Sequence, residues 1–338
     1  MSDKIYNYFN VDELNEIFPT FESIIPKIEY SRKNATIPKV LYHYTCIDAF
    51  ISIMQNRNFW ISNIRYMNDS QEFINGKTIF KNVIQRRLQK ESPKVTKFLL
   101  KLLNLCENDT SNGFLKINSK DIFSLSFCTD GDILTQWQCY GNEGISIGFY
   151  NDFSSIDRIT FMDENQYNEE IKEIPPNEMK PHDELIFFVR KVIYNDEEKK
   201  QIFNQIIDVG IKSIEKFNGT IEDLCIDEIS DVLFYYFAIM KDEHFSHEQE
   251  IRFLHFTEKD DQKIHFRKKG KIILPYLKQK ILNANCRPHD KFPVSDIVIA
   301  PGSCQEFVAE SVKYFLAKSG YEYLVDKVRT SKITYRSE

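Results

Sequence analysis

The stretch DIFSLSFC, residues 121–128, alternates strictly between apolar and small polar side chains. Successive side chains of a β-strand point to opposite faces, so the alternation places Phe127 on one face and Ser124 and Ser126 on the other. Residues 144–150 repeat the pattern with three apolar side chains at every second position. We therefore predict two strands of one sheet, joined by a polar and aromatic connection.

Outward from these two strands, the chain mixes short apolar runs with segments of helical period. Further strands are predicted at 40–44, 59–63, 250–256 and 296–300, with a hairpin over 264–274 and a strand-rich end over 321–335. Helices are predicted at 12–28, 47–54, 71–105, 227–241 and 305–318. Thr45 followed by Asp48 fits a capping box that would begin the helix at 47–54.

This order of elements lacks both a regular βαβ rhythm and a glycine-rich phosphate loop. It favours an α+β fold with a mixed, mainly antiparallel sheet and helices packed around it. We predict a helical leader at 1–37 and one elaborated domain at 38–338, with helical insertions near 71–120 and 183–245. The acidic, proline-bearing segment 151–183 is predicted to be an exposed insertion.

Composition excludes several classes of protein. Of the 338 residues, 42% are hydrophobic, but no apolar run approaches the roughly 20 residues of a membrane helix. The net charge of −6 argues against general affinity for a nucleic-acid backbone. The beginning of the chain lacks the pattern of a secretory signal, and the seven cysteines are scattered without a C-x-x-C pair. We expect a cytoplasmic protein with reduced thiols, no metal and no membrane contact.

Two segments near the beginning of the predicted domain carry groups that hydrogen-bond ligands. His43 ends a strand and Thr45 begins a helix, where a hydroxyl and free backbone N–H groups can hold a sugar or an anion. Ser62 and Asn63 end the next predicted strand, 59–63, and Tyr66 follows it. The alternatives stay open: Thr45 only caps its helix, His43 is a satisfied strand histidine, and the second segment makes turns.

Two further segments combine aromatic, amide and charged groups. Trp137 and Tyr140 lie between two strands and would form either an aromatic wall for a planar ligand or a hydrophobic flap over the core. Glu248 and Glu250 are two residues apart beside Arg252, which in a strand would bring all three side chains to one face. Such a cluster serves either as an acid/base centre or as a surface ion pair.

Residues 263–280 carry seven lysines or arginines and no acidic residue. A basic hairpin of this kind contacts nucleic acid, phosphate or a membrane surface, or is simply a solvated hairpin.

Taken together, these segments resemble a bacterial and phage family known as domain of unknown function 2971. The resemblance covers residues 39–336 in five ordered matches: 41–45, 59–63 with 68–69, 124–127 with 136–141, 248–252 and 331–336. Family membership by itself implies no settled activity.

A second resemblance is to the NAD-binding core of ADP-ribosyltransferases, carried by residues 41–45, the helix after them and Glu250. It implies that His43 and Thr45 hold the adenine-side ribose of NAD and that the backbone of Tyr44 holds the nicotinamide amide. Glu250 would bind the nicotinamide-ribose hydroxyl and stabilise an oxocarbenium-like transition state. Glu248 would reproduce the E-x-E form of some members.

The function expected from this resemblance is ADP-ribosyl transfer or NAD hydrolysis, in a toxin or anti-phage effector. NAD would be the substrate, and a protein or nucleic acid the acceptor. The first alternative is a non-catalytic nucleotide- or peptide-binding module whose aromatic recognition surface includes Trp60 and Trp137. The second is a metal-dependent nucleic-acid enzyme that uses the basic segment 263–280.

Overall fold

The computed structural model describes residues 37–67, 72–107, 120–141, 144–150, 188–216, 222–280 and 292–334. The chain divides into two compact units. The helical unit contains the described residues of 69–119 and 193–243, and the sheet unit contains those of 37–68, 120–192 and 244–338. The helix predicted at 12–28 and the insertion predicted at 151–183 lie outside the described residues.

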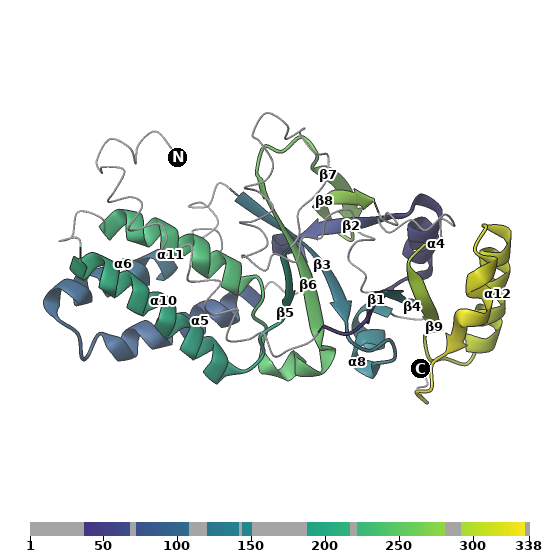
Figure 1. Cartoon of the computed structure of the whole chain (residues 1–338), viewed down its shortest axis with the longest axis horizontal. Helices are drawn as coiled ribbons and strands as arrows, with labels where there is room; N and C mark the ends of the chain where they lie inside the picture. Colours follow the sequence, from purple (N-terminus) through teal and green to yellow (C-terminus); the bar gives the residue numbers. More distant parts are fainter. Residues whose placement is uncertain are drawn as a thin grey trace, which may run out of the picture. The chain divides into compact units, whose positions relative to one another are not determined.

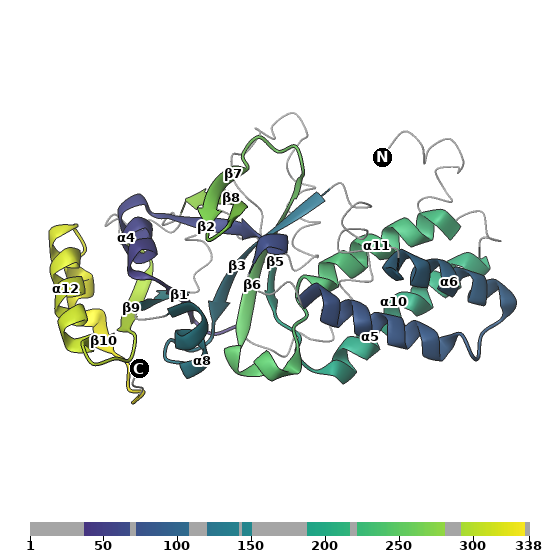
Figure 2. The ribbon, with the colours of Figure 1, turned by 180° about the vertical axis from the view of Figure 1, so that it is seen from behind.

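The helical unit is built from four described helices, which Figures 1 and 2 label α5, α6, α10 and α11. They span Glu72–Arg87, Pro93–Glu107, Asp196–Lys216 and Glu222–Phe237. The edge-on rings of Phe80, Phe203 and Phe237 join α5, α10 and α11 in its core. The two segments predicted as insertions therefore supply the helices of one unit.

Two helix boundaries in this unit differ from the sequence predictions. The helix predicted over 71–105 is two helices, because Pro93 begins α6 and Ser92 accepts a hydrogen bond from the backbone N–H of Val95. The helix predicted at 227–241 begins five residues earlier and ends at Phe237.

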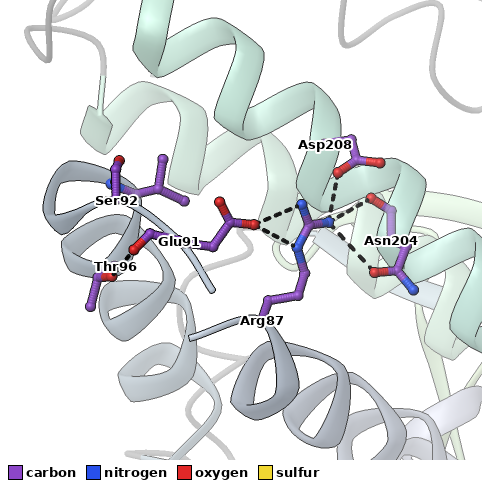
Figure 3. A network of polar contacts seen from close by, with 7 residues as sticks. Arg87, Glu91, Ser92, Thr96, Asn204 and Asp208 are labelled. Carbon is purple, nitrogen blue, oxygen red and sulfur yellow. Dashed lines mark hydrogen bonds and ion pairs between the residues drawn. The ribbon is translucent and has the colours of Figure 1, made fainter. Parts of the chain in front are cut away.

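Arg87 connects α5 to α10, as Figure 3 shows. Its Nη1 lies 2.6 Å from Oδ1 of Asp208 and also donates to Asn204, while Nη2 lies 3.2 Å from Glu91. These contacts are partly exposed to solvent, so they add little to stability and mainly fix how the two helices pack.

The sheet unit contains ten described strands in one sheet. The path runs β10-β9-β4-β1-β3-β2-β8-β7, while β6 pairs with β3 and β5 pairs with β6. Every pair is antiparallel except β9 with β10, which confirms the prediction of a mixed, mainly antiparallel sheet. In chain order the strands are β1 Val40–Thr45, β2 Asn58–Asn63, β3 Lys120–Cys128, β4 Ile145–Tyr150, β5 Phe188–Lys191, β6 Glu250–Glu258, β7 His265–Lys269, β8 Ile272–Lys280, β9 Val294–Ile299 and β10 Val328–Thr330.

Strand β3 is the branch point of this sheet. It pairs with β6 along its whole length on one edge. On its other edge it pairs with β1 at Cys128 and with β2 at Ser124 and Phe123. Strands β1 and β2 therefore leave the same edge of β3 at different points, and the sheet is forked between them.

The two faces of the sheet differ as the alternation of β3 predicts. Phe123, Leu125 and Phe127 belong to a large buried cluster that also contains residues of α4, Ile47–Asn56, and of α12, Gln305–Lys318. We call this side the apolar face. Ser124 and Ser126 point to the opposite side, the serine face.

Three local predictions concern element ends and turns. The capping box is wrong: Thr45 stays in β1 opposite Ile145, and Cys46 is the N-cap of α4 without a side-chain hydrogen bond. The predicted hairpin around Gly270 is confirmed, with β7 and β8 joined through that residue at a φ of 56°. The end predicted to be strand-rich contains a 3₁₀ helix at Glu322–Lys327 and only the short strand β10.

Candidate functional site

Three buried serine hydroxyls on the serine face have no hydrogen-bond partner among the described residues: the Oγ atoms of Ser124, Ser126 and Ser146. In the ladder between β3 and β6, Ser126 is opposite Arg252 and Ser124 is opposite Leu254. Ser146 on β4 is opposite Tyr44 on β1. Buried hydroxyls normally find a partner, so this face offers donors and acceptors that the described chain does not satisfy.

Glu250 and Arg252 form a buried ion pair on the same face. Nε of Arg252 lies 2.8 Å from Oε1 of Glu250, and Nη2 lies 3.0 Å from Oε2. The two residues are only 4% and 1% exposed. This two-point contact holds both side chains rigidly next to Ser126, which lies directly opposite Arg252.

Glu248 is buried, but it does not share a strand with Glu250 as the sequence spacing predicts. Strand β6 begins at Glu250, and Glu248 ends a 3₁₀ helix that spans Glu243–Glu248. Between them, Gln249 has a φ of 46°, and its side chain accepts a hydrogen bond from the hydroxyl of Thr129. The left-handed residue breaks the alternation on which the same-face prediction rested.

Tyr44 and Trp137 meet edge to face on the serine-face side, with ring centroids 4.7 Å apart. The Tyr44 hydroxyl donates to the carbonyl of Asp130 and accepts from the N–H of Ile133, and burial is the main cause that raises the pKa of Tyr44. Trp137 is 3% exposed, whereas Tyr140 is 38% exposed. The indole is thus packed into a hydrophobic cluster, which fits the flap alternative better than an open wall.

Asp132 ties Trp137 to the C-terminal segment. Its Oδ1 accepts from Nε1 of Trp137 at 2.9 Å and from the hydroxyl of Ser331 at 2.5 Å. Its Oδ2 accepts from the backbone N–H of Lys332 at 2.8 Å. Three of the matched sequence segments, 41–45, 136–141 and 331–336, therefore lie close together beside β1. No sequence motif predicted a role for Asp132.

His43 and Thr45 are not brought together with Glu250. Within β1 their side chains alternate with that of Tyr44, and they lie on the apolar face. His43 lies between the rings of Phe59 and Phe127, and its Nδ1 lies 3.0 Å from the carbonyl oxygen of Ser126, to which it donates. The His43 side chain of β1 thus contacts both β2 and β3 where β1 and β2 diverge. Burial lowers the pKa of its imidazole.

The residues predicted at the end of β2 have three different environments. Ser62 accepts a hydrogen bond from Nη2 of Arg267 at 3.0 Å. Asn63 is buried and accepts from the N–H of Arg65, which caps the short 3₁₀ helix Ile64–Tyr66. Tyr66 is among the exposed aromatic residues. Asn63 therefore makes a turn, as the alternative predicted. Ser62 instead contacts the basic hairpin through its hydrogen bond with Arg267.

The three serines are the site residues that sequence reasoning missed. The alternation of 121–128 placed Ser124 and Ser126 correctly, but a small polar residue on a strand face is ordinarily solvent-exposed. Neither the burial of Ser124, which is 3% exposed, nor the lack of a hydroxyl partner among the described residues follows from the local pattern. Within the described residues, no group of three side chains could hold a metal ion, and no helix could cross a membrane.

A family model with the description "Protein of unknown function (DUF2971)" matches residues 136–253. The family resemblance predicted from the sequence is confirmed over this segment, which includes Trp137, Glu250 and Arg252. No curated protein and no solved structure matches the chain.

Proposed function

Because the matching family is defined without an activity, we propose from the geometry that the serine face binds a small-molecule nucleotide, and that the nucleotide is NAD. The observation that carries this proposal is a set of buried hydroxyls on one face that have no hydrogen-bond partner among the described residues: those of Ser124 and Ser126, across the β3–β6 ladder from the strand of the Glu250–Arg252 ion pair, and that of Ser146 on β4. A ligand rich in hydroxyls and phosphates provides the partners that these groups lack.

The energetic reason is the cost of leaving buried polar groups unpaired. Each unsatisfied buried hydroxyl costs about 1–3 kcal/mol, so three of them on one face favour a ligand or ordered water there. Ribose hydroxyls both donate and accept hydrogen bonds, which suits serine. Arg252 adds a rigidly held planar guanidinium to this face, although its charge is largely offset by the Glu250 carboxylate.

A second candidate function extends the first: the site cleaves NAD and transfers ADP-ribose. Two observations favour it. Glu250 is buried on the serine face, and its strand β6 and the His43 strand β1 both flank β3. This candidate rests on Glu250, because His43 and Thr45 lie on the apolar face of β1 and cannot hold the ribose as the resemblance implied; His43 would have only a positioning role at the fork.

In that reaction the bond between nicotinamide and C1′ of the ribose breaks, and its electron pair leaves with nicotinamide. The Glu250 carboxylate would stabilise the positive charge that develops on the ribose. Water or an acceptor group then attacks C1′ and loses a proton. The alternative is a binding module without catalysis. It needs the serine hydroxyls for binding but does not need the Glu250 carboxylate.

Calorimetric titration with NAD tests the binding proposal. The variant Ser124→Ala/Ser126→Ala is expected to weaken NAD binding by about tenfold or more, since two hydrogen bonds are lost. The control is Ser311→Ala, because Ser311 is an exposed serine of α12 whose hydroxyl donates to the carbonyl of Val308 in its own helix. No heat of binding with the unmodified protein, or equal affinity in all three proteins, would refute the proposal.

A nicotinamide-release assay separates catalysis from binding. Glu250→Gln keeps the size of the side chain but removes its charge, so catalysis predicts a loss of about 100-fold or more in rate. The binding module predicts no turnover in the unmodified protein and NAD affinity that depends on the serines. Turnover that survives Glu250→Gln unchanged would exclude a role for this carboxylate.

A further inference from the structure

A second polar surface lies on β2, β8 and β7, on the same side of the sheet as the serine face and adjoining it where Ser62 is opposite Ser124; the argument for it does not rest on the NAD proposal. On one side of these strands, Trp60 is opposite Lys278, and Ser62 is opposite Tyr276. Arg267 on β7 is opposite Leu274 of β8 and points to the same side. We call this set, Trp60, Ser62, Arg267, Tyr276 and Lys278, the Trp60 patch.

The patch is a stack of aromatic rings and a guanidinium. The ring centroids of Trp60 and Tyr276 are 4.7 Å apart, and Cζ of Arg267 lies 5.2 Å from the centroid of Trp60. Ser62 fixes Arg267 through its hydrogen bond with Nη2. Trp60 nevertheless stays 40% exposed, so part of its indole is available to a partner.

The surroundings of the stack are strongly basic. The segment 263–280, which forms both β7 and β8, carries seven lysines or arginines and no acidic residue, although the whole chain has a net charge of −6. Lys278 is exposed directly across from Trp60. A polyanion would therefore be attracted to this hairpin and repelled by much of the remaining chain.

We propose that the Trp60 patch binds single-stranded nucleic acid. An exposed indole beside cations on a sheet face is the arrangement on which an unpaired base stacks while neighbouring lysines contact phosphates. Stacking on Trp60 requires a base with a free face. Bases of a single strand have one, whereas bases of a duplex are already stacked on each other. Arg267, held by Ser62 against the indole, adds a planar cation beside the base.

The main competing partner is an anionic membrane, because the same hairpin exposes apolar side chains. Phe266 and Ile273 are 65% and 71% exposed. Their positions in the β7–β8 ladder place them on the side opposite Arg267 and Tyr276. Nucleic acid and a membrane would therefore bind opposite sides of one hairpin. Substitutions on each side distinguish the two partners.

The test uses fluorescence anisotropy of a labelled single-stranded oligonucleotide titrated with the full chain. Trp60→Ala is expected to weaken binding by about tenfold or more, since stacking contributes strongly to affinity. Lys278→Glu, which leaves the stack intact, is expected to weaken binding and to reduce its salt dependence. Phe266→Ala should bind like the unmodified protein.

The matched control is Tyr314→Ala. Tyr314 is an exposed aromatic residue of α12, 69% exposed, and Nζ of Lys318 lies 5.7 Å from its ring centroid, so this pair copies the chemistry of the patch elsewhere. Its substitution should not change oligonucleotide affinity. Trp137→Phe leaves Trp60 as the only indole, and its fluorescence should be quenched when the oligonucleotide binds.

Three results would overturn the proposal. The first is that the oligonucleotide does not bind at low salt. The second is that Trp60→Ala and Tyr314→Ala bind with equal affinity. The third is binding to phosphatidylserine vesicles, lost in Phe266→Ala, with no binding to the oligonucleotide. Loss of NAD binding in Ser124→Ala/Ser126→Ala with unchanged oligonucleotide affinity would separate this site from the serine face.

Discussion

The two faces of β3 are buried to a similar degree but are satisfied very differently. Phe127 on the apolar face is 2% exposed and packs against Phe59, Phe149 and Phe253. Ser124 on the serine face is 3% exposed, and its hydroxyl has no hydrogen-bond partner in the part of the chain that the structure describes. The apolar face is complete within the chain, whereas the serine face has hydrogen-bonding capacity left over. Stability should therefore depend on the first face and binding on the second.

The largest expected effect comes from the apolar face. Phe127→Ala removes a buried ring from a cluster of aromatic side chains and should lower the free energy of unfolding by about 4 kcal/mol. Chemical denaturation measures this change. Ser124→Ala on the other face of the same strand is the control, with an expected change within about 1 kcal/mol. Equal losses for the two variants would contradict the division between the faces.

The ion pair is the part of the serine face on which stability should depend. Arg252→Met leaves the buried Glu250 carboxylate without this partner and should lower the free energy of unfolding by about 3 kcal/mol. The double variant Glu250→Gln/Arg252→Met should recover most of that loss, because the uncompensated charge is gone. A double-mutant cycle by chemical denaturation measures the coupling, and additive losses would show that the pair is not coupled.

The sequence predicts the strands themselves better than their surroundings. The alternation of 121–128 correctly assigns both faces of β3, because a period of two needs no knowledge of neighbours. The same spacing fails for Glu248, since the left-handed Gln249 ends the alternation one residue before β6. Thr45 fails as a cap because its place in the ladder with β4 extends β1 to that residue.

Long-range pairing accounts for what the sequence does not predict about the site. The sequence predicts that His43 and Glu250 lie in one site, because both match motifs of the ADP-ribosyltransferases. The fork of the sheet instead turns His43 toward Phe59 and the carbonyl of Ser126. Which strands flank β3 is decided by pairings between residues 60 to 138 positions apart in the sequence, and no local pattern encodes them. For the same reason, the burial of Ser124 is invisible in the sequence.

The fork makes stability depend on pH through His43. Burial lowers the pKa of this histidine in the folded state from its ordinary value of 6.5, so the unfolded chain binds the proton more readily. The contribution of neutral His43 is therefore complete above about pH 6.5 and is lost as the pH falls below that value. His43→Gln should be less stable at pH 7.5, and its stability should fall less between pH 7.5 and 5.5. Parallel curves for the two proteins, measured by denaturation, would exclude this role.

The smallest expected effect separates a satisfied serine from an unsatisfied one. Ser146 is fully buried, and its hydroxyl has no hydrogen-bond partner within the described ranges, so Ser146→Ala removes a polar atom that does not stabilise the free protein. Its free energy of unfolding should rise by about 1 kcal/mol, the lower end of the cost of an unsatisfied buried hydroxyl.

Ser62→Ala is the matched control on the same side of the same sheet, because Ser62 accepts a charge-assisted hydrogen bond from Arg267. This variant should lose about 1 kcal/mol. Opposite signs for the two serine substitutions, measured by denaturation without ligand, would show that the hydroxyl of Ser146 is kept for something other than stability.

If NAD occupies the serine face, adding it should make the unmodified protein more stable than Ser146→Ala, since the unmodified protein would then gain the bond that the alanine variant cannot make. A loss of stability in Ser146→Ala without ligand would mean that the hydroxyl already has a partner, and the argument for a ligand on this face would lose one of its three supports.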